Sequence, residues 1–125
     1  CETMTADVSI LNRIKTAYNS TTYFNKFPQT VTLNSATPQI LVKNISQTKT
    51  GTKDITGRFE ATYRVEVIGS VYLTVKDTAV AITALLESFS DSAVYVVSYD
   101  GEFYDTNETA EIHRVIVDYR AFINI

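Results

Sequence analysis

The residue best suited to acid–base chemistry in this 125-residue chain is its single histidine, His113. It precedes Val115, Val117 and Tyr119, which alternate with polar residues, so it lies at the end of an expected buried strand face. Nucleophilic catalysis also requires a serine or cysteine held beside a base, and no such elbow motif occurs near His113. We therefore expect a structural histidine and no enzyme activity.

A cluster of acidic residues is the best sequence candidate for a metal site. Its members lie in an expected loop, residues 100–110, and just after it: Asp100, Glu102, Asp105, Glu108 and Glu111. Calcium loops place their oxygen ligands in the order D-x-[DN]-x-[DN]-G, which this segment lacks. The four glycines fit no phosphate-binding fingerprint either. We expect no metal and no cofactor.

The charge balance argues against a protein that grips nucleic acid. The chain carries 14 acidic and 11 basic residues, a net charge of −3, and no run of Lys or Arg. Tight binding to a phosphate backbone needs clustered cations, whereas a mildly acidic surface lets DNA pass without specific binding. No apolar stretch approaches the ~20 residues that cross a bilayer, and the one cysteine is Cys1. We expect a soluble, intracellular protein with no membrane partner.

Two segments have the apolar periodicity of amphipathic helices. The first runs from Asp7 to Tyr18 with Thr5 as its expected N-cap. The second runs from Thr74 to Phe89 and opens on a T-x-x-D sequence, which predicts a capping box between Thr74 and Asp77. Each helix therefore has one apolar stripe to bury.

The strand pattern is clearest from Arg58 to Val67 and from His113 to Ile125, where apolar and polar residues alternate. Shorter apolar runs, residues 40–45 and 93–99, predict two more strands, the second of them an inner one. The order α-β-β-α-β-β predicts an α+β fold: a two-layer domain with a largely antiparallel four-stranded sheet and two helices on one face. We expect residues 1–125 to form a single domain.

Loops account for the rest of the expected structure. Residues 19–30 are rich in Asn, Ser and Thr, residues 46–57 are polar and bounded by glycine, and residues 100–110 are acidic. The start of the chain, residues 1–4, is expected to be flexible. Loops longer than a turn needs are often functional. Deleting Thr50 to Asp54 is therefore expected to impair docking to a partner without changing stability.

The charged sides of the two long strands, together with the two long loops, are the candidate interface. They contribute Lys49, Thr50, Lys53, Asp54, Arg58, Glu60, Arg64, Glu66, Asp100, Glu102, Asp105, Arg114, Asp118 and Arg120. We expect the strand charges to point away from the helices, where they form a solvated sheet face or meet a neighbouring subunit or a lumen.

Three segments carry a resemblance to a known family: ATYRVEVIGS (Ala61 to Ser70), TVKDTAVAITALLESF (Thr74 to Phe89) and EIHRVIVDYRAFIN (Glu111 to Asn124). Together they resemble the tail-terminator, or tail-completion, proteins of long-tailed bacteriophages. The resemblance implies a virion protein assembled in the host cytoplasm. It also implies a hexameric ring that caps the tail tube, stops tube growth and contacts the tail tube protein and the head-proximal connector, with DNA passing through the lumen.

Other functions remain open at the level of sequence. A head-completion or stopper protein is also small, acidic and ring-forming. A ferredoxin-like ligand-binding or regulatory domain would need a pocket with convergent polar groups, which the sequence does not locate. An enzyme would have to depend on His113 or on the acidic segment.

Overall fold

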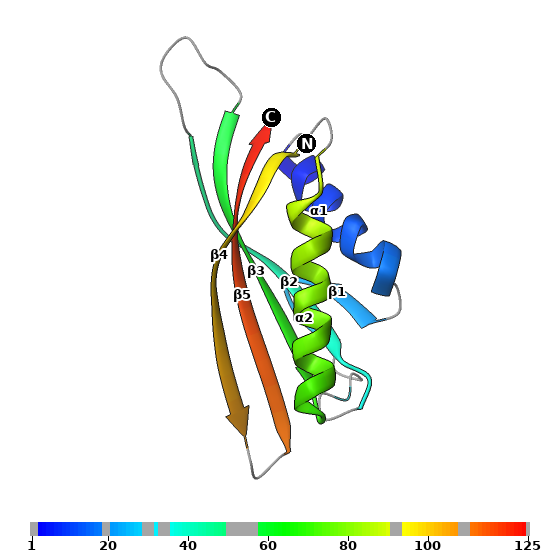
Figure 1. Ribbon diagram of the computed structural model, residues 1–125. Helices are drawn as coiled ribbons and strands as arrows, with labels where there is room; N and C mark the ends of the chain where they lie inside the picture. The colour runs from blue at the N-terminus through cyan, green and yellow to red at the C-terminus, as the bar shows by residue number, and fades with distance from the viewer. Residues whose placement is uncertain are drawn as a thin grey trace.

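The computed structural model describes residues 3–18, 21–28, 32, 36–49, 58–90, 94–107 and 111–124. Two helices and five strands follow one another along the chain (Figure 1). They are α1 (Thr3–Tyr18), β1 (Thr22–Phe24), β2 (Gln39–Lys49), β3 (Arg58–Gly69), α2 (Tyr72–Glu87), β4 (Val94–Asn107) and β5 (Ile112–Asn124).

The strands form one sheet in the order β1-β2-β3-β5-β4. The four long strands pair antiparallel, whereas β1 pairs parallel to β2. The α+β class and the largely antiparallel sheet are confirmed, but the prediction of four strands is wrong. The fifth strand, β1, lies inside the segment expected to be a loop. Its three residues, TYF, are too few to show an alternating pattern.

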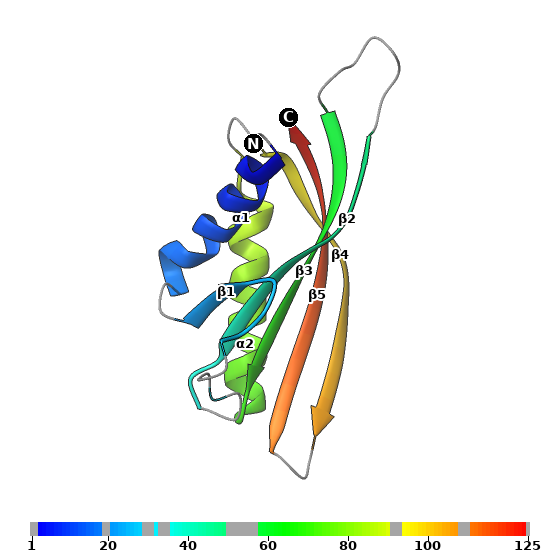
Figure 2. The same ribbon diagram turned by 180° about the vertical axis from the view of Figure 1, so that it is seen from behind.

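Both helices cover the same face of the sheet, as Figures 1 and 2 show from opposite sides. The core lies between these two layers. In the sheet, Val65 pairs with Val117 and Tyr63 with Tyr119, so the apolar sides of β3 and β5 lie next to each other. The helices contribute fully buried apolar side chains to the same cluster, among them Ile10, Ile14, Ile82 and Leu86. The predicted inward faces of the strands are therefore confirmed.

Both helices begin earlier than their expected caps. Helix α1 begins at Thr3, so Thr5 lies inside the helix and is not its N-cap. Helix α2 begins at Tyr72, and its N-cap residue, Val71, is extended and makes no side-chain cap hydrogen bond. The capping box predicted for Thr74 and Asp77 is therefore wrong. The extra turn carries Tyr72, whose ring packs against Tyr104 of β4 with centroids 4.9 Å apart.

Two strands continue through segments expected to be loops. Strand β2 extends to Lys49 and β4 to Asn107, so the loop predictions are wrong for residues 46–49 and 100–107. Residues 50–57 and 108–110 lie outside the described part of the chain. The strand expected inside the sheet, β4, lies at its edge and pairs with β5 as far as Ile112. An edge strand exposes more of its length to water, which explains why its polar and acidic composition looked like a loop.

Two buried tyrosines connect the helices to the sheet. The Tyr63 hydroxyl donates a hydrogen bond of 2.5 Å to Asp7 of α1, and Asn44 of β2 donates another to the same carboxylate at 3.1 Å. The Tyr119 hydroxyl lies 2.7 Å from Thr83 of α2. Burial raises the pKa of both tyrosines well above the ordinary value, and for Tyr63 the neighbouring Asp7 carboxylate raises it further. Both hydroxyls therefore remain protonated, and their hydrogen bonds fix the position of each helix on the sheet.

Candidate interaction surfaces

The face of the sheet opposite the helices carries the alternating charges of β3 and β5. Arg64 and Asp118 are direct partners across these two strands. The Arg64 guanidinium donates two hydrogen bonds to the Asp118 carboxylate, at 2.8 and 3.1 Å. This hydrogen-bonded contact with Asp118 raises the pKa of Arg64 further above its ordinary value. The prediction that these charges point away from the helices is confirmed here.

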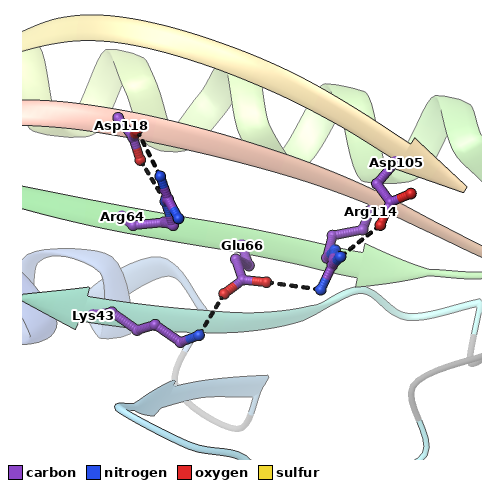
Figure 3. Close-up of polar contacts among 6 residues, drawn as sticks. All are labelled: Lys43, Arg64, Glu66, Asp105, Arg114 and Asp118. Atoms are coloured by element: carbon purple, nitrogen blue, oxygen red, sulfur yellow. Dashed lines mark hydrogen bonds and ion pairs between the residues drawn. The ribbon is translucent and has the colours of Figure 1, made fainter. Parts of the chain in front are cut away.

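A second set of contacts crosses all four long strands (Figure 3). Glu66 of β3 lies at its centre: one carboxylate oxygen is 2.9 Å from Lys43 of β2 and the other is 3.2 Å from Arg114 of β5. Arg114 also contacts Asp105 of β4 at 2.5 Å. We call these four residues, Lys43, Glu66, Arg114 and Asp105, the charge ladder. The ladder ties each long strand to its neighbour through side chains as well as through the backbone.

A third group of charges lies farther along the same face. Arg120 of β5 contacts Glu60 of β3 at 2.8 Å and Asp100 of β4 at 3.6 Å. Together with the ladder and the Arg64–Asp118 pair, this group gives a carboxylate partner to each cation described on the sheet face, namely Lys43, Arg64, Arg114 and Arg120. The described part of this face therefore offers DNA phosphates no unneutralised basic group.

Burial separates one of these contacts from the others. Exposed ion pairs contribute about 0–1 kcal/mol each, and most residues on this face are at least partly exposed. The Glu66 side chain is only 7% exposed, whereas that of Asp105 is 57% exposed. A buried carboxylate depends on its partners far more than an exposed one. Glu66 is therefore the carboxylate on this face that depends most on its ion-pair partners.

Several predicted interface residues do not join this face. Glu102 lies in strand β4 and not in a loop, and it turns toward the helix layer and contacts Lys76 of α2; its role at an interface stays a prediction. Lys49 and Arg58 lie at strand ends, but their side chains are outside the described structure. Thr50, Lys53 and Asp54 lie outside the described residues altogether.

The acidic segment does not converge on one point. Asp100 and Asp105 contact arginines on the charged sheet face, whereas Glu102 contacts a lysine on the helix side. Among the residues that the structure describes, no group of three His, Cys, Asp or Glu side chains is placed to hold a metal ion. Glu102 and Asp105 point to opposite faces by ordinary strand alternation. Asp100 and Glu102 do so because the register of β4 on β5 shifts between Tyr99 and Gly101.

His113 lies in an aromatic cluster at the start of β5. Its Nδ1 atom is 2.7 Å from the Tyr104 hydroxyl and 3.5 Å from that of Thr106, and its ring stacks on Tyr104 with centroids 6.1 Å apart. Tyr72 completes the cluster, 5.9 Å from the histidine ring. These partners connect β4, β5 and the first turn of α2, which is a structural use of His113.

A further surface combines α2 with the helix-side residues of β4. It carries exposed apolar or aromatic side chains at Tyr72, Leu73, Val80, Tyr99 and Tyr104, with exposed fractions from 38% to 69%. We call these five residues the α2–β4 surface. Leu73 and Val80 are on the side of α2 opposite its buried residues, and the Tyr72–Tyr104 contact joins the helix to the strand.

Sequence reasoning missed Lys43, Lys76, Tyr72 and Tyr104. Lys43 had a detectable signal, because it alternates with Val42 and Asn44 along the expected strand. The expected end of that strand, near residue 45, was too early. Tyr72 and Lys76 follow helical spacing, but the expected helix start at Thr74 excluded Tyr72. Tyr104 gave no signal, because its segment was assigned to a loop.

None of the described helices is both long and apolar enough to span a membrane. Comparison with known proteins gives no matching family model and no matching curated protein. A chain from a solved structure of the virion of a native gene transfer agent particle has a similar fold, with a TM-score of 0.66 and 14% sequence identity. The match covers 94% of this chain and 93% of that chain. At this level of identity the likeness establishes a shared fold.

Proposed function

We propose that this protein is a structural component of a phage-like virion, a tail terminator that forms a ring at the head-proximal end of the tail tube. The observation that carries the proposal is the fold shared with a chain of a gene transfer agent virion over nearly the full length of both chains. The three segments that resemble tail-terminator proteins include nearly all of α2 and all of β5. The sequence resemblance and the fold likeness therefore point to the same class of protein.

The charged sheet face suits a protein past which DNA must move. Each described cation on this face contacts a carboxylate of the same chain, so binding a phosphate there would first require breaking an ion pair. Nucleic-acid affinity depends on cations that are free to replace counterions. In the proposed ring, DNA passes through the lumen without being held. The role is one of assembly and not of catalysis, and it places the protein in particles assembled in the host cytoplasm.

Removal of the gene from the producing phage or prophage tests this proposal. Without the protein, we expect tails of irregular length that do not join heads, and purified protein added to tube ends should restore a uniform length. Immunogold labelling in negative stain should locate the protein at the head-proximal end of tails isolated without heads. Particles with normal, joined tails in its absence would contradict the proposal.

The same images separate the terminator from a head-completion or stopper protein. A terminator remains with headless tails, whereas a stopper remains with tailless heads. Label found only on the heads would therefore replace the tail-terminator role with the stopper role while retaining a virion function. A six-fold ring in averaged end views is the expected subunit arrangement.

A further inference from the structure

Two acidic side chains that flank the α2–β4 surface have no ionic partner within the described chain. Asp77 and Glu87 are both exposed on α2, and neither forms an ion pair there. Helical spacing places them on either side of the exposed stripe that contains Leu73 and Val80, roughly 15 Å apart along the axis. The result is an exposed apolar stripe with a negative charge on each side.

Two basic side chains on another flank of the molecule are also unpaired within the described residues. Lys15 lies in the last turn of α1, and Lys26 is exposed just after β1. Neither takes part in an ion pair of the described chain. Val8, 45% exposed, lies close to the Lys15 side of α1 by helical spacing. We call Val8, Lys15 and Lys26 the α1–β1 surface.

The two surfaces belong to opposite edges of the sheet. Strand β1 is the first strand and β4 the last in the order β1-β2-β3-β5-β4. In Figures 1 and 2 the lower part of β4 lies on one side of the molecule, and the lower end of α1 lies with β1 on the other. One copy can therefore use both surfaces at once, each with a different neighbour.

From this arrangement we infer that the α2–β4 surface of one copy docks on the α1–β1 surface of the next copy, with Asp77 and Glu87 facing Lys15 and Lys26. The inference rests on the proposed function, for which it names the contact between neighbouring subunits. A second copy is the favoured occupant because this chain itself supplies the complementary charges. Complementary patches that differ from each other produce head-to-tail contacts, which close into rings when the rotation permits.

Charge reversal tests the contact with an internal control. One variant carries Asp77→Lys and Glu87→Lys, and the other carries Lys15→Glu and Lys26→Glu. Each variant alone places like charges across the contact, and we expect its self-association, alone or on purified tube ends, to weaken by about tenfold or more. An equimolar mixture restores opposite charges at every contact, so assembly should recover. This recovery also shows that both variants fold.

Analytical ultracentrifugation and negative-stain counting of capped tube ends measure the outcome. Either variant assembling alone as well as the unmodified chain overturns the inference, as does a mixture that fails to recover. Leu73→Ser with Val80→Ser provides a second test without charge reversal, and it should weaken the same association. If that variant assembles normally, the apolar stripe is not part of the contact and the inference is overturned.

The outcomes separate this inference from the proposed function. An unmodified chain that neither self-associates nor joins tube ends overturns both. An unmodified chain that caps tubes, together with reversal variants that cap them equally well, overturns only the docking contact. A variant with Asp77→Lys and Glu87→Lys that still forms rings but no longer joins tubes would assign the α2–β4 surface to the tube protein, which also overturns the second-copy contact.

Discussion

At the scale of single residues, Glu66 has the most demanding environment on the charged sheet face. Its carboxylate bridges Lys43 and Arg114, cations from two different strands, while its own side chain is nearly inaccessible to water. Alternation along β3 predicted that this residue would point away from the helices. It did not predict burial, because burial depends on the neighbours that β2 and β5 place over it.

Replacing Glu66 by alanine tests the importance of that position. Glu66→Ala leaves two partly exposed cations without their shared partner, and we expect the free energy of unfolding to fall by about 1–3 kcal/mol. The matched change Asp105→Ala removes an exposed member of the same ladder and should cost about 0.5 kcal/mol or less. Urea unfolding followed by circular dichroism measures both. Equal losses would show that burial of Glu66 contributes nothing.

Tyr119 should make stability depend on alkaline pH. Burial raises its pKa, so the folded chain keeps this phenol proton after the unfolded chain has begun to lose it. The contribution is complete below pH ~10 and declines as pH rises further, by up to about 1.4 kcal/mol per pH unit. Tyr119→Phe removes the ionisation, so its free energy of unfolding should fall less steeply above pH ~10.

Urea titrations of both proteins from pH 8 to about pH 11 provide the comparison. At neutral pH the Phe variant should lose about 1 kcal/mol, because the hydrogen bond to Thr83 is absent. Lysines titrate equally in both proteins and cancel in the difference. Parallel pH profiles would mean that Tyr119 ionises as easily in the folded chain as in the unfolded one.

At the scale of elements, a β-bulge explains why the predicted interface residues of β4 divide between the two faces of the sheet. The register of β4 on β5 shifts between Tyr99 and Gly101, where Asp100 is the extra residue. Compared with regular alternation, one extra residue moves the side chain of every later residue of the strand to the other face of the sheet. Because of it Asp105 meets Arg114, whereas Glu102 and Tyr104 turn toward α2. Sequence alternation alone does not predict such a shift, although Gly101, which lies next to it, is a residue type that often marks a bulge.

The extra residue itself should therefore be dispensable for the register. Deletion of Asp100 leaves Gly101 opposite Asp118, so Asp105 and Tyr104 keep their faces, and we expect a loss of about 1 kcal/mol or less. Asp100→Ala keeps the register and removes only a 3.6 Å contact with Arg120, so it should cost about 0.5 kcal/mol or less. Thermal and urea unfolding measure both. A loss of more than about 2 kcal/mol for the deletion alone would contradict this and would show that the bulge itself stabilises the sheet.

The long elements were predictable because packing and local pattern agree in them. Strands β3 and β5 alternate along their length, and their residues pair as that alternation requires. Helix starts were not predictable from cap residues, because tertiary contacts such as Tyr72 on Tyr104 extend α2 past its apparent cap. Strand β1 depends on its parallel pairing with β2, a contact between segments that no local window of the sequence contains.

At the scale of the whole molecule, the segment between β2 and β3 remains the sequence-based candidate for contact with a partner. Deleting residues 50–54 should reduce binding to tube ends by about tenfold or more, while the melting temperature changes by about 2 °C or less. A variant with Gly and Ser at the same positions keeps the spacing and tests side chains alone. Cosedimentation with tail tubes and differential scanning calorimetry give the two readouts. A large drop in melting temperature would assign the segment a structural role.

The shape of the edge strand β4 also bears on how the protein avoids uncontrolled association. The backbone pairing of β4 with β5 is interrupted twice, between Val94 and Val96 and between Tyr99 and Gly101. A regular, flat edge of this length would be a template on which further chains could add backbone to backbone without limit. The interruptions twist and shorten the runs available for such pairing. Contacts between copies therefore depend on side chains. The fit of side chains can limit an assembly to a fixed number of subunits, whereas backbone pairing along an open edge sets no such limit.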